Sequence, residues 1–286
     1  MYQMLADNVH KLKRKSRLGQ IIVVILASQL LCLSSFLGFK LPIATASNVE
    51  RFWYQSVYQL WETVPANTQE QVFEKLPQAA NYCQNCKAWS SGGVRYTNYV
   101  PQAPLAIFVG YALGPVLGCL AGCIFLVIGL VGPLLNLHIF SAGGTSYYTQ
   151  PSFGYLLGMV LACFVTGKLT KDKADSVRQL WAVLAGLACV HLTGLLYLFS
   201  AYFLSGMLSA GQASLIFGSS TGVPWSQWVS QEARNFTYYP LPFDVIFSFC
   251  AIGLGFPFRW LVSILTAPDI GSMRVKQPQK LEEYLP

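Results

Sequence analysis

Residues 103–138, "APLAIFVGYALGPVLGCLAGCIFLVIGLVGPLLNLH", contain no lysine, arginine, aspartate or glutamate. The charge-free stretch extends in both directions, from Arg95 to Lys168, and a second one separates Arg178 from Glu232. Crossing roughly 30 Å of hydrocarbon takes about 20 apolar residues, so these stretches are long enough for several helices. In lipid only helices or closed barrels satisfy their backbone groups, and the runs lack the two-residue alternation of a barrel. The sequence therefore predicts an all-α membrane protein.

Composition supports the same class and argues against others. Charged residues make up 11% of the 286 residues, against about 25% in soluble domains. No phosphate-binding loop, zinc-protease motif or serine-hydrolase motif occurs in the chain. We therefore expect no enzyme activity, no cofactor and no metal site. The net charge is +7, but the basic residues form no visible patch interleaved with side chains that could recognise nucleic-acid bases. No nucleic-acid partner is therefore expected.

Six transmembrane helices divide the chain into five parts. Residues 1–19 form an N-terminal segment, 20–39 the first span, and 40–101 a large insertion. Residues 102–265 hold the remaining spans, and 266–286 form a tail. The six spans are expected at 20–39, 103–116, 117–138, 152–169, 179–203 and 241–264. The first span follows a basic stretch, is longer than a signal peptide core and lacks a clean cleavage pattern, so it is interpreted as a retained signal anchor.

Basic residues indicate how the chain is oriented. They are concentrated before the first span, between the fourth and fifth spans, and after the sixth, whereas the other loops carry few over much longer lengths. The excess of lysine and arginine in short cytoplasmic loops places both termini in the cytoplasm. The loops 40–101, 139–151 and 204–240 are then extracytoplasmic.

The insertion at 40–101 has signals of its own. Ser47 followed by Glu50 is a capping-box pattern, and the residues after it have the spacing of an amphipathic helix. That helix is expected on the membrane surface or as a roof over the bundle. The segment "YCQNC" places Cys83 and Cys86 outside the cytoplasm, where a structural disulfide is favoured over redox catalysis and over a zinc site.

Glycines at every fourth position predict close helix packing. Gly114, Gly118 and Gly122 form one series, and Gly154 and Gly158 form another. Small residues at this spacing let two helix backbones approach closely within lipid. These glycines are interpreted as packing positions.

Two ionisable side chains lie within apolar segments. Asp244 is the one charged residue of the segment "YYPLPFDVIFSFC", residues 238–250, and a carboxylate within the membrane is costly enough to suggest a function. The alternative is that Pro240 and Pro242 begin the helix and Asp244 complements its N-terminal dipole. His191 lies in the fifth span with no evident carboxylate partner and is interpreted as a packed, hydrogen-bonded histidine.

The uncharged connector "SAGGTSYYTQPSFGYLLG", residues 141–158, is rich in glycine, hydroxyl and aromatic groups. Thr145 and its neighbours offer neutral donors and acceptors, and the aromatic rings offer apolar walls. Such a lining suits a pocket for a small organic molecule. We expect the connector and Asp244 to meet in space and form one cup that opens to the exterior.

The ordered motifs of residues 98–262 resemble the BioY family, the biotin-binding S-components of energy-coupling factor (ECF) transporters. "HLTGLLYL" at 191–198 and "PLPFD" at 240–244 continue the resemblance through the last two spans. The earlier motifs are Pro101-Gln102, Leu113-Gly114-Pro115 with Gly118, Gly129-Leu130-Val131-Gly132, Phe140 with Ala142-Gly143-Gly144, and Pro151-Ser152-Phe153-Gly154-Tyr155-Leu156-Leu157-Gly158.

The resemblance implies a six-helix protein of the bacterial plasma membrane that binds biotin at its outer face. It also implies a transmembrane coupling protein and ATP-binding subunits as partners within the lipid bilayer. The residues that would face or support the ligand are Gln102, Gly143, Gly144, Thr145, Tyr155 and Asp244. Where the family has lysine three residues after the aspartate, this chain has Phe247. Two alternatives are an S-component for another vitamin and a membrane thiol-disulfide oxidoreductase that uses Cys83 and Cys86.

Overall fold

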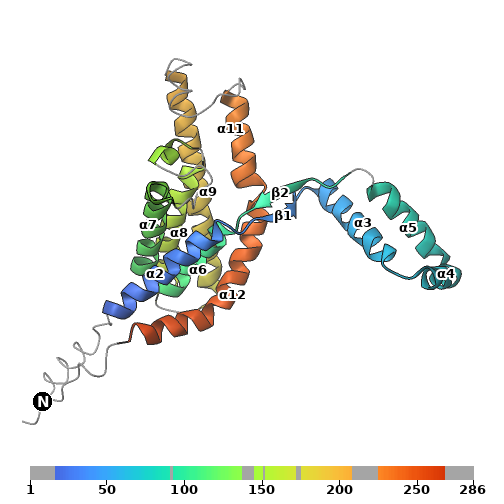
Figure 1. Ribbon diagram of the computed structural model, residues 1–286, viewed down its shortest axis with the longest axis horizontal. Coiled ribbons are helices and arrows are strands. Elements are labelled where there is room, and N and C mark those ends of the chain that lie inside the picture. The colour runs from blue at the N-terminus through green and yellow to red at the C-terminus, as the bar shows by residue number, and fades with distance from the viewer. Residues whose placement is uncertain are drawn as a thin grey trace, which may run out of the picture.

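In a computed structural model the protein is a bundle of apolar helices with a separate helical lobe (Figure 1). The structure describes residues 17–90, 93–136, 145–150, 152–171, 175–207 and 225–267. The bundle helices are α2 (Arg17–Ser34), α6 (Gln102–Leu113), α7 (Pro115–Val131), α8 (Phe153–Leu169), α9 (Ser176–Met207) and α12 (Leu241–Leu265). Shorter elements border them, namely the 3-10 helices η1 (Gly132–Leu135) and η2 (Thr145–Thr149), α11 (Trp225–Ala233) and the π-helical turn η3 (Arg234–Tyr238).

A helix lies at each of the six predicted spans. Four helical segments are long and apolar enough to cross a membrane, namely Arg17–Ser34, Pro115–Leu134, Ser176–Leu204 and Ser226–Leu265. The helices Gln102–Leu113 and Phe153–Leu169 are apolar but shorter. The basic segment before the first span and the tail fall largely on residues 1–16 and 268–286, which lie outside the described residues.

The junction between α6 and α7 is a single residue, Gly114, with a φ of 81°. This left-handed conformation ends α6, and Pro115 begins α7 at once, which suits a ring with a fixed φ and no N–H. No atom outside the local chain lies within 4 Å of the position that a Gly114 side chain would take. The interpretation of Gly114 as a packing residue is therefore wrong, because it shapes the turn.

The remaining glycines of the two series are packing positions, as expected. A Cβ on Gly158 of α8 would lie 2.7 Å from the Cα of Val190 on α9. A Cβ on Gly118 of α7 would lie 3.1 Å from the Cα of Gly110 on α6. The backbones of these helix pairs are thus in direct contact, which is how helices associate where lipid removes the hydrophobic driving force.

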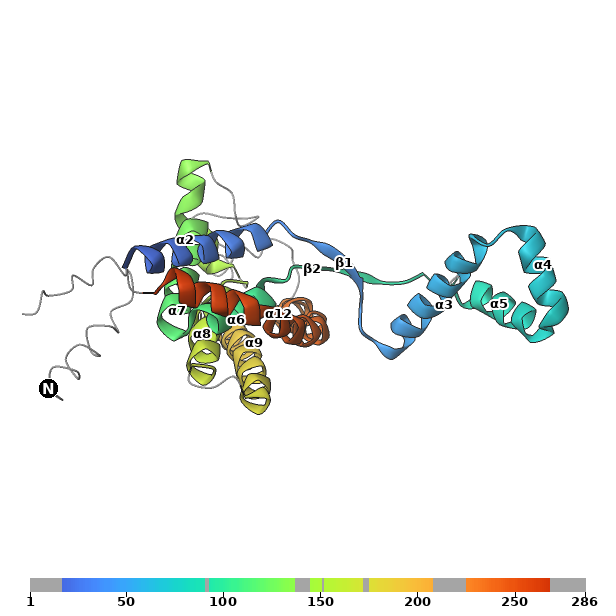
Figure 2. The same ribbon diagram turned by 90° about the horizontal axis from the view of Figure 1, so that it is seen from below.

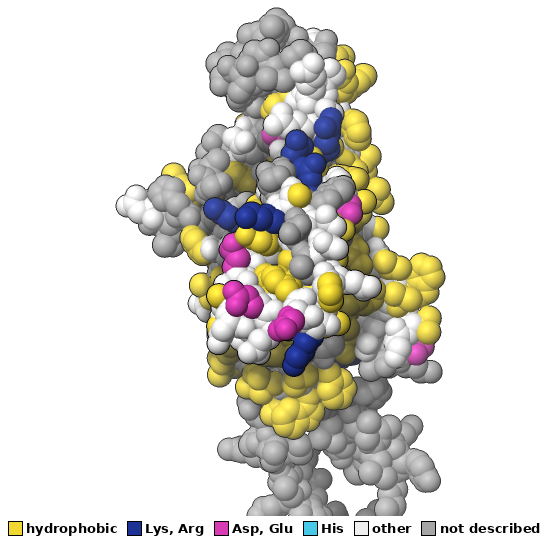
Figure 3. Space-filling model, turned by 90° about the vertical axis from the view of Figure 1, so that its right-hand side faces the viewer, with side chains coloured by type: hydrophobic (Ala, Val, Ile, Leu, Met, Phe, Trp, Pro, Cys, Tyr) yellow, Lys and Arg dark blue, Asp and Glu magenta, His cyan; other side chains and the backbone are white. Residues whose placement is uncertain are grey.

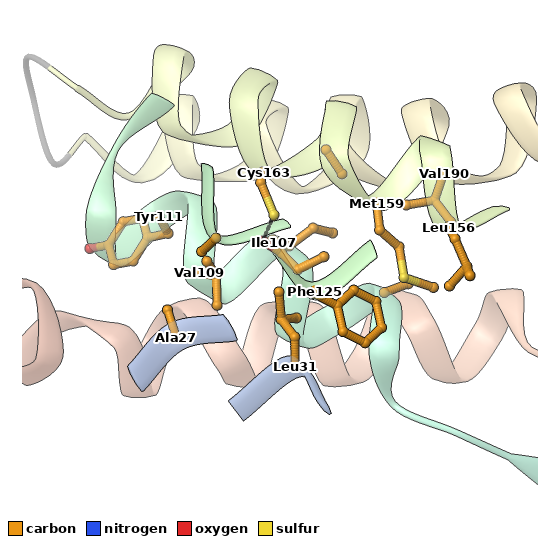
Figure 4. Close-up of a cluster of buried hydrophobic side chains, with 14 of the residues drawn as sticks. Ala27, Leu31, Ile107, Val109, Tyr111, Phe125, Leu156, Met159, Cys163 and Val190 are labelled. Carbon is orange, nitrogen blue, oxygen red and sulfur yellow. Dashed lines mark hydrogen bonds between the residues drawn. The ribbon is translucent and has the colours of Figure 1, made fainter. Parts of the chain in front are cut away.

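The centre of the bundle is a cluster of buried side chains to which all six bundle helices contribute (Figure 4). Leu31 from α2, Ile107 from α6, Phe125 from α7 and Leu156 from α8 are at most 4% exposed. Val190 of α9 also belongs to the cluster. The core therefore fixes α8 and α9 side by side.

The outer face of the bundle is apolar as well. Val116, Leu196, Leu254 and Phe256 are between 66% and 71% exposed on α7, α9 and α12. Exposed apolar surface on this scale marks a surface that meets lipid or a partner. It agrees with the membrane class that composition predicts.

The insertion forms a lobe held away from the bundle by a two-stranded antiparallel ribbon (Figures 1 and 2). The strands β1 (Phe39–Pro42) and β2 (Tyr96–Tyr99) pair Phe39 with Tyr99 and Pro42 with Tyr96. The lobe contains α3 (Ala46–Glu62), α4 (Ala66–Lys75) and α5 (Pro77–Ser90). Acidic and basic side chains lie among apolar ones on the lobe surface (Figure 3).

The amphipathic helix is present as α3, but it does not roof the bundle, because it packs against α5 at the far end of the ribbon. The capping box is also wrong. Thr45 is the N-cap, without a side-chain cap bond, and Ser47 lies inside the helix. The side chain of Asn48 sets the start instead, by donating to the carbonyls of Ile43 and Arg95 and accepting from the Arg95 N–H.

Cys83 and Cys86 lie one turn apart in α5, and both are free thiols in this structure. Cβ atoms at this spacing on a regular helix are about 5–6 Å apart, whereas a disulfide needs roughly 3.5–4.5 Å. The disulfide expected from the sequence is therefore not formed, because the helix is continuous through both cysteines. Burial, with the neighbouring Cys86 as a smaller cause, raises the pKa of Cys83.

Candidate ligand-binding site

A cavity of about 490 Å³ lies where β2 and η3 meet helices α6, α8, α9 and α12. Its volume is in the range of roughly 300–1,000 Å³ that is usual for small-molecule sites. Polar side chains stand among aromatic and aliphatic ones in its wall. The lining residues are Ser35, Thr97, Asn98, Tyr99, Val100, Gln102, Ala103, Tyr147, Ser152, Tyr155, Leu156, Met159, Val190, His191, Asn235, Phe236, Pro240 and Asp244.

Asp244 is placed in this wall by the start of α12. Pro240 is the N-cap, and a further proline in the first turn of the helix fits a position where no N–H partner is needed. Asp244 follows in the first turn, near the positive end of the helix dipole, and is only 3% exposed. Asp244 therefore lies where it complements the dipole and also faces a cavity, so the two interpretations are compatible.

Tyr99, the last residue of β2, is the closest partner of Asp244. Its hydroxyl donates to Asp244 Oδ1 over 2.8 Å, and its ring lies 5.7 Å from that of Phe243 and 5.5 Å from that of Phe247. Burial, and secondarily the negative charge and hydrogen bond of Asp244, raise the pKa of the Tyr99 phenol, so it remains a proton donor. Phe247, which stands where the family has lysine, forms an aromatic support for this tyrosine.

His191 of α9 is the second partner. Its Nε2 lies 3.3 Å from Asp244 Oδ2, and the residue is 7% exposed. The interpretation that His191 lacks a carboxylate partner is therefore wrong, because α9 and α12 bring the two side chains together across the bundle. The expected hydrogen bond is also not found: the contact is close but poorly aligned, and both imidazole nitrogens are buried without a hydrogen-bond partner among the described residues.

The connector and Asp244 do meet, as far as the connector is described. The cavity that Asp244 lines is also lined by Tyr147 of η2, by Ser152 at the N-cap of α8 and by Tyr155 of α8. The Tyr147 and Ser152 hydroxyls are 2.7 Å apart, and the Tyr155 hydroxyl is 2.7 Å from that of Thr237 in η3. These contacts hold the connector and η3 against the N-terminal end of α8.

The other predicted site residues have different outcomes. Gln102 lines the cavity and donates from Nε2 to Ser35 Oγ over 2.8 Å, which fits the supporting role expected for it. Thr145 begins η2. Gly143 and Gly144 lie outside the described residues.

A Tyr99→Phe change tests how firmly Asp244 is held. It removes one hydroxyl from a ring that is 2% exposed and keeps the aromatic packing. We expect a loss of about 1–3 kcal/mol in the free energy of unfolding, because the buried carboxylate loses a donor. Thermal or denaturant unfolding in detergent measures it, with Tyr96→Phe at the exposed end of the same strand as the control. Equal stability of the two variants would contradict the prediction.

These features define a helical membrane protein with a cavity of mixed polar and apolar lining at one end of the bundle. The BioY family model matches residues 97–262 of this chain, which is more than half of its length and includes β2, α6 to α9 and α12. The chain belongs to the BioY family. All cavity-lining residues except Ser35 lie within the matched range.

Individual relatives resemble part of the chain. A protein of Thermotoga maritima described as "Biotin transporter BioY" is 29% identical over 113 residues, 39% of this chain and 64% of the relative. A "Probable biotin transporter BioY" of Lysinibacillus sphaericus is 33% identical over 104 residues, 35% of this chain and 50% of the relative. The chain thus matches between half and just under two thirds of these curated relatives.

A solved structure is also similar. It is the crystal structure of the S-component for biotin from an ECF-type ABC transporter, with a TM-score of 0.40 and 18% sequence identity. The alignment covers 60% of this chain and 81% of that chain.

Proposed function

We propose that this chain is a biotin-binding membrane component that captures biotin at the outer face of the bacterial plasma membrane and delivers it inward. Family membership and the names of the two relatives support biotin as the ligand. The observation that carries the proposal is the buried carboxylate of Asp244 in the wall of a cavity of about 490 Å³.

The chemistry of biotin fits this wall. Its ureido ring presents two N–H donors, one of which a carboxylate can accept in a strong charge-assisted bond. Tyr99 and His191 each approach a different oxygen of Asp244, and each oxygen has further acceptor capacity. The Tyr99 hydrogen bond compensates the carboxylate in part before the ligand binds, so Asp244 is not the unpaired group that its sequence context suggests. The rings of Tyr155 and Phe236, 5.5 Å apart, offer an aromatic surface to the thiophane ring.

The proposed topology has six membrane spans, with both termini in the cytoplasm. The bias of lysine and arginine toward the short loops of one side supports this orientation. In this orientation the insertion of residues 40–101 lies outside the cell, and its strand β2 helps to line the cavity. Biotin would then enter from the exterior.

Inward delivery is proposed to depend on an ECF coupling protein and ATP-binding subunits, because the sequence contains no phosphate-binding loop of its own. Uptake of labelled biotin into proteoliposomes that contain the chain, with and without such partners, tests this dependence. ATP-driven accumulation is expected with partners present. Equal accumulation in their absence would contradict the dependence and leave biotin binding in place.

Equilibrium binding of biotin to the purified full chain, by isothermal titration calorimetry in detergent, tests the ligand. We expect saturable binding at one site per chain, unchanged in a Cys83→Ser/Cys86→Ser double variant. The two thiols lie in the lobe, away from the cavity, which gives the oxidoreductase alternative no support (Figure 1). Folded protein that binds a different vitamin and no biotin would contradict the proposal, as would loss of binding in the cysteine variant.

A further inference from the structure

The imidazole of His191 is an unused hydrogen-bonding group in the cavity wall. It is 7% exposed, lines the cavity, and neither nitrogen has a hydrogen-bond partner among the described residues. A buried polar group left in this state costs about 1–3 kcal/mol, and native structures satisfy nearly all such groups. An unpaired imidazole in a cavity wall therefore indicates that its hydrogen-bond partner is an atom of the bound ligand.

His191 differs from the other cavity-lining residues in its ability to donate a strong hydrogen bond. Among the lining residues in the described part of the chain, Asp244 is the acidic side chain, and none is a lysine or arginine. The other groups that face His191 are neutral donors or acceptors, such as the hydroxyls of Tyr99 and Tyr155. The Tyr155 ring meets the imidazole edge-on with centroids 6.3 Å apart and leaves both of its nitrogens unoccupied. His191 is therefore the cavity group best able to donate a strong hydrogen bond to a ligand oxygen.

We propose that His191 is a ligand-binding residue that donates to the ureido carbonyl of biotin while Asp244 accepts from the adjacent ureido N–H. The inference rests on the proposed function and adds a specificity-determining residue to it. In this arrangement the pair recognises a donor beside an acceptor, which is the pattern of a cyclic urea.

The separation of the two protein groups suits this pattern. His191 Nε2 and Asp244 Oδ2 are 3.3 Å apart, and the oxygen and nitrogen of a ureido group are about 2.3 Å apart from standard amide bond lengths. Two hydrogen bonds that diverge slightly from the ligand would reach both partners. Because the imidazole is not aligned with the carboxylate, it can turn toward the ligand without breaking a hydrogen bond of its own.

Replacement of His191 by phenylalanine and by glutamine tests the role. His191→Phe keeps an aromatic ring and removes the donor, and we expect biotin to bind about ten- to a hundredfold more weakly. His191→Gln restores an N–H donor and should recover at least part of that loss. Leu192→Phe, at a neighbouring residue that is 59% exposed, is the control and should bind as the unmodified chain does.

A second ligand separates hydrogen bonding from shape. In 2-iminobiotin a cyclic guanidinium replaces the ureido group at neutral pH, so the carbonyl acceptor is absent. The ratio of the two dissociation constants should shift in His191→Phe by at least about tenfold in favour of 2-iminobiotin. Size-exclusion profiles and thermal unfolding confirm that each variant is folded.

The outcomes distinguish this inference from the function on which it rests. No biotin binding by the folded unmodified chain overturns the proposed function and the inference together. Normal biotin binding by both His191 variants, in a protein that loses binding when Asp244 is changed, overturns the inference alone. An equal loss for biotin and 2-iminobiotin in His191→Phe also overturns it, because a purely steric role predicts that result.

Discussion

Replacing Asp244 by asparagine is expected to weaken biotin binding by at least about a hundredfold. The carboxylate accepts a ureido N–H group, and a hydrogen bond to a charged group contributes about 1.5–3 kcal/mol. Asparagine has nearly the same shape, but it replaces one acceptor oxygen with an amide donor that would face a ligand donor. It still offers an acceptor to the Tyr99 hydroxyl, which is 2.8 Å from Asp244 Oδ1, so the protein should remain folded.

Isothermal titration calorimetry of the full chain in detergent measures this effect. Asp175→Asn is a matched control, because Asp175 is exposed and lies just before α9, outside the cavity. It should bind biotin as the unmodified chain does. A folded Asp244→Asn protein with a dissociation constant within threefold of the original would remove Asp244 from the ligand contacts.

Gly158→Val is expected to have the largest effect on stability. The added side chain would begin 2.7 Å from the backbone of Val190, and a backbone cannot move aside as a flexible side chain can. Overpacking of a well-packed interior costs about 1–3 kcal/mol and sometimes more, so we expect the unfolding midpoint in detergent to fall by about 10 °C. Biotin binding should also fall, since α8 carries Tyr155 and α9 carries His191.

The same substitution at Gly253 is the control for this prediction. Gly253 lies in α12 with nothing within 4 Å of its missing side chain, so Gly253→Val should leave the midpoint within about 2 °C. Similar losses at both positions would contradict the packing argument, because Gly253 has open space around it and valine has a higher helix propensity than glycine. The close approach of α8 and α9 would then contribute little.

The positions of the helices could be predicted from the sequence because they depend on local properties. Charge-free stretches of sufficient length locate the spans, and glycine spacing locates the contact between α8 and α9. Gly114 shows the limit of spacing alone: it fits the series of Gly118 and Gly122, yet its φ of 81° assigns it to a turn. Spacing does not distinguish a glycine needed for its small size from one needed for its backbone conformation.

The groups around Asp244 could not be predicted in the same way. Tyr99 is 145 residues away along the chain, and nothing in its local sequence marks it as a partner. His191 is visible as a polar residue in an apolar span, and that feature is the signal that could have found it. Pairing it with Asp244 requires knowing which faces of α9 and α12 are adjacent, which is set by packing across the bundle.

The lobe shows a third case. Its amphipathic helix could be predicted from periodicity, but its first residue is set by Asn48, which bonds to Arg95 from the other end of the insertion. The long-range contact of Asn48 therefore determines where the helix begins, and the local capping pattern of Ser47 and Glu50 does not. The positions of Cys83 and Cys86 within one helix likewise depend on where α5 begins and ends.

The antiparallel register of the ribbon has a consequence for how this part of the molecule tolerates change. Because Pro42 pairs with Tyr96, the two ends of the lobe leave the ribbon side by side. A segment anchored in this way can be lengthened, shortened or exchanged for another module at little cost, since the entropy of closing a loop grows slowly with its length. Variation at the tip would leave Tyr99 beside Asp244, so the lobe and the cavity wall are free to diversify independently.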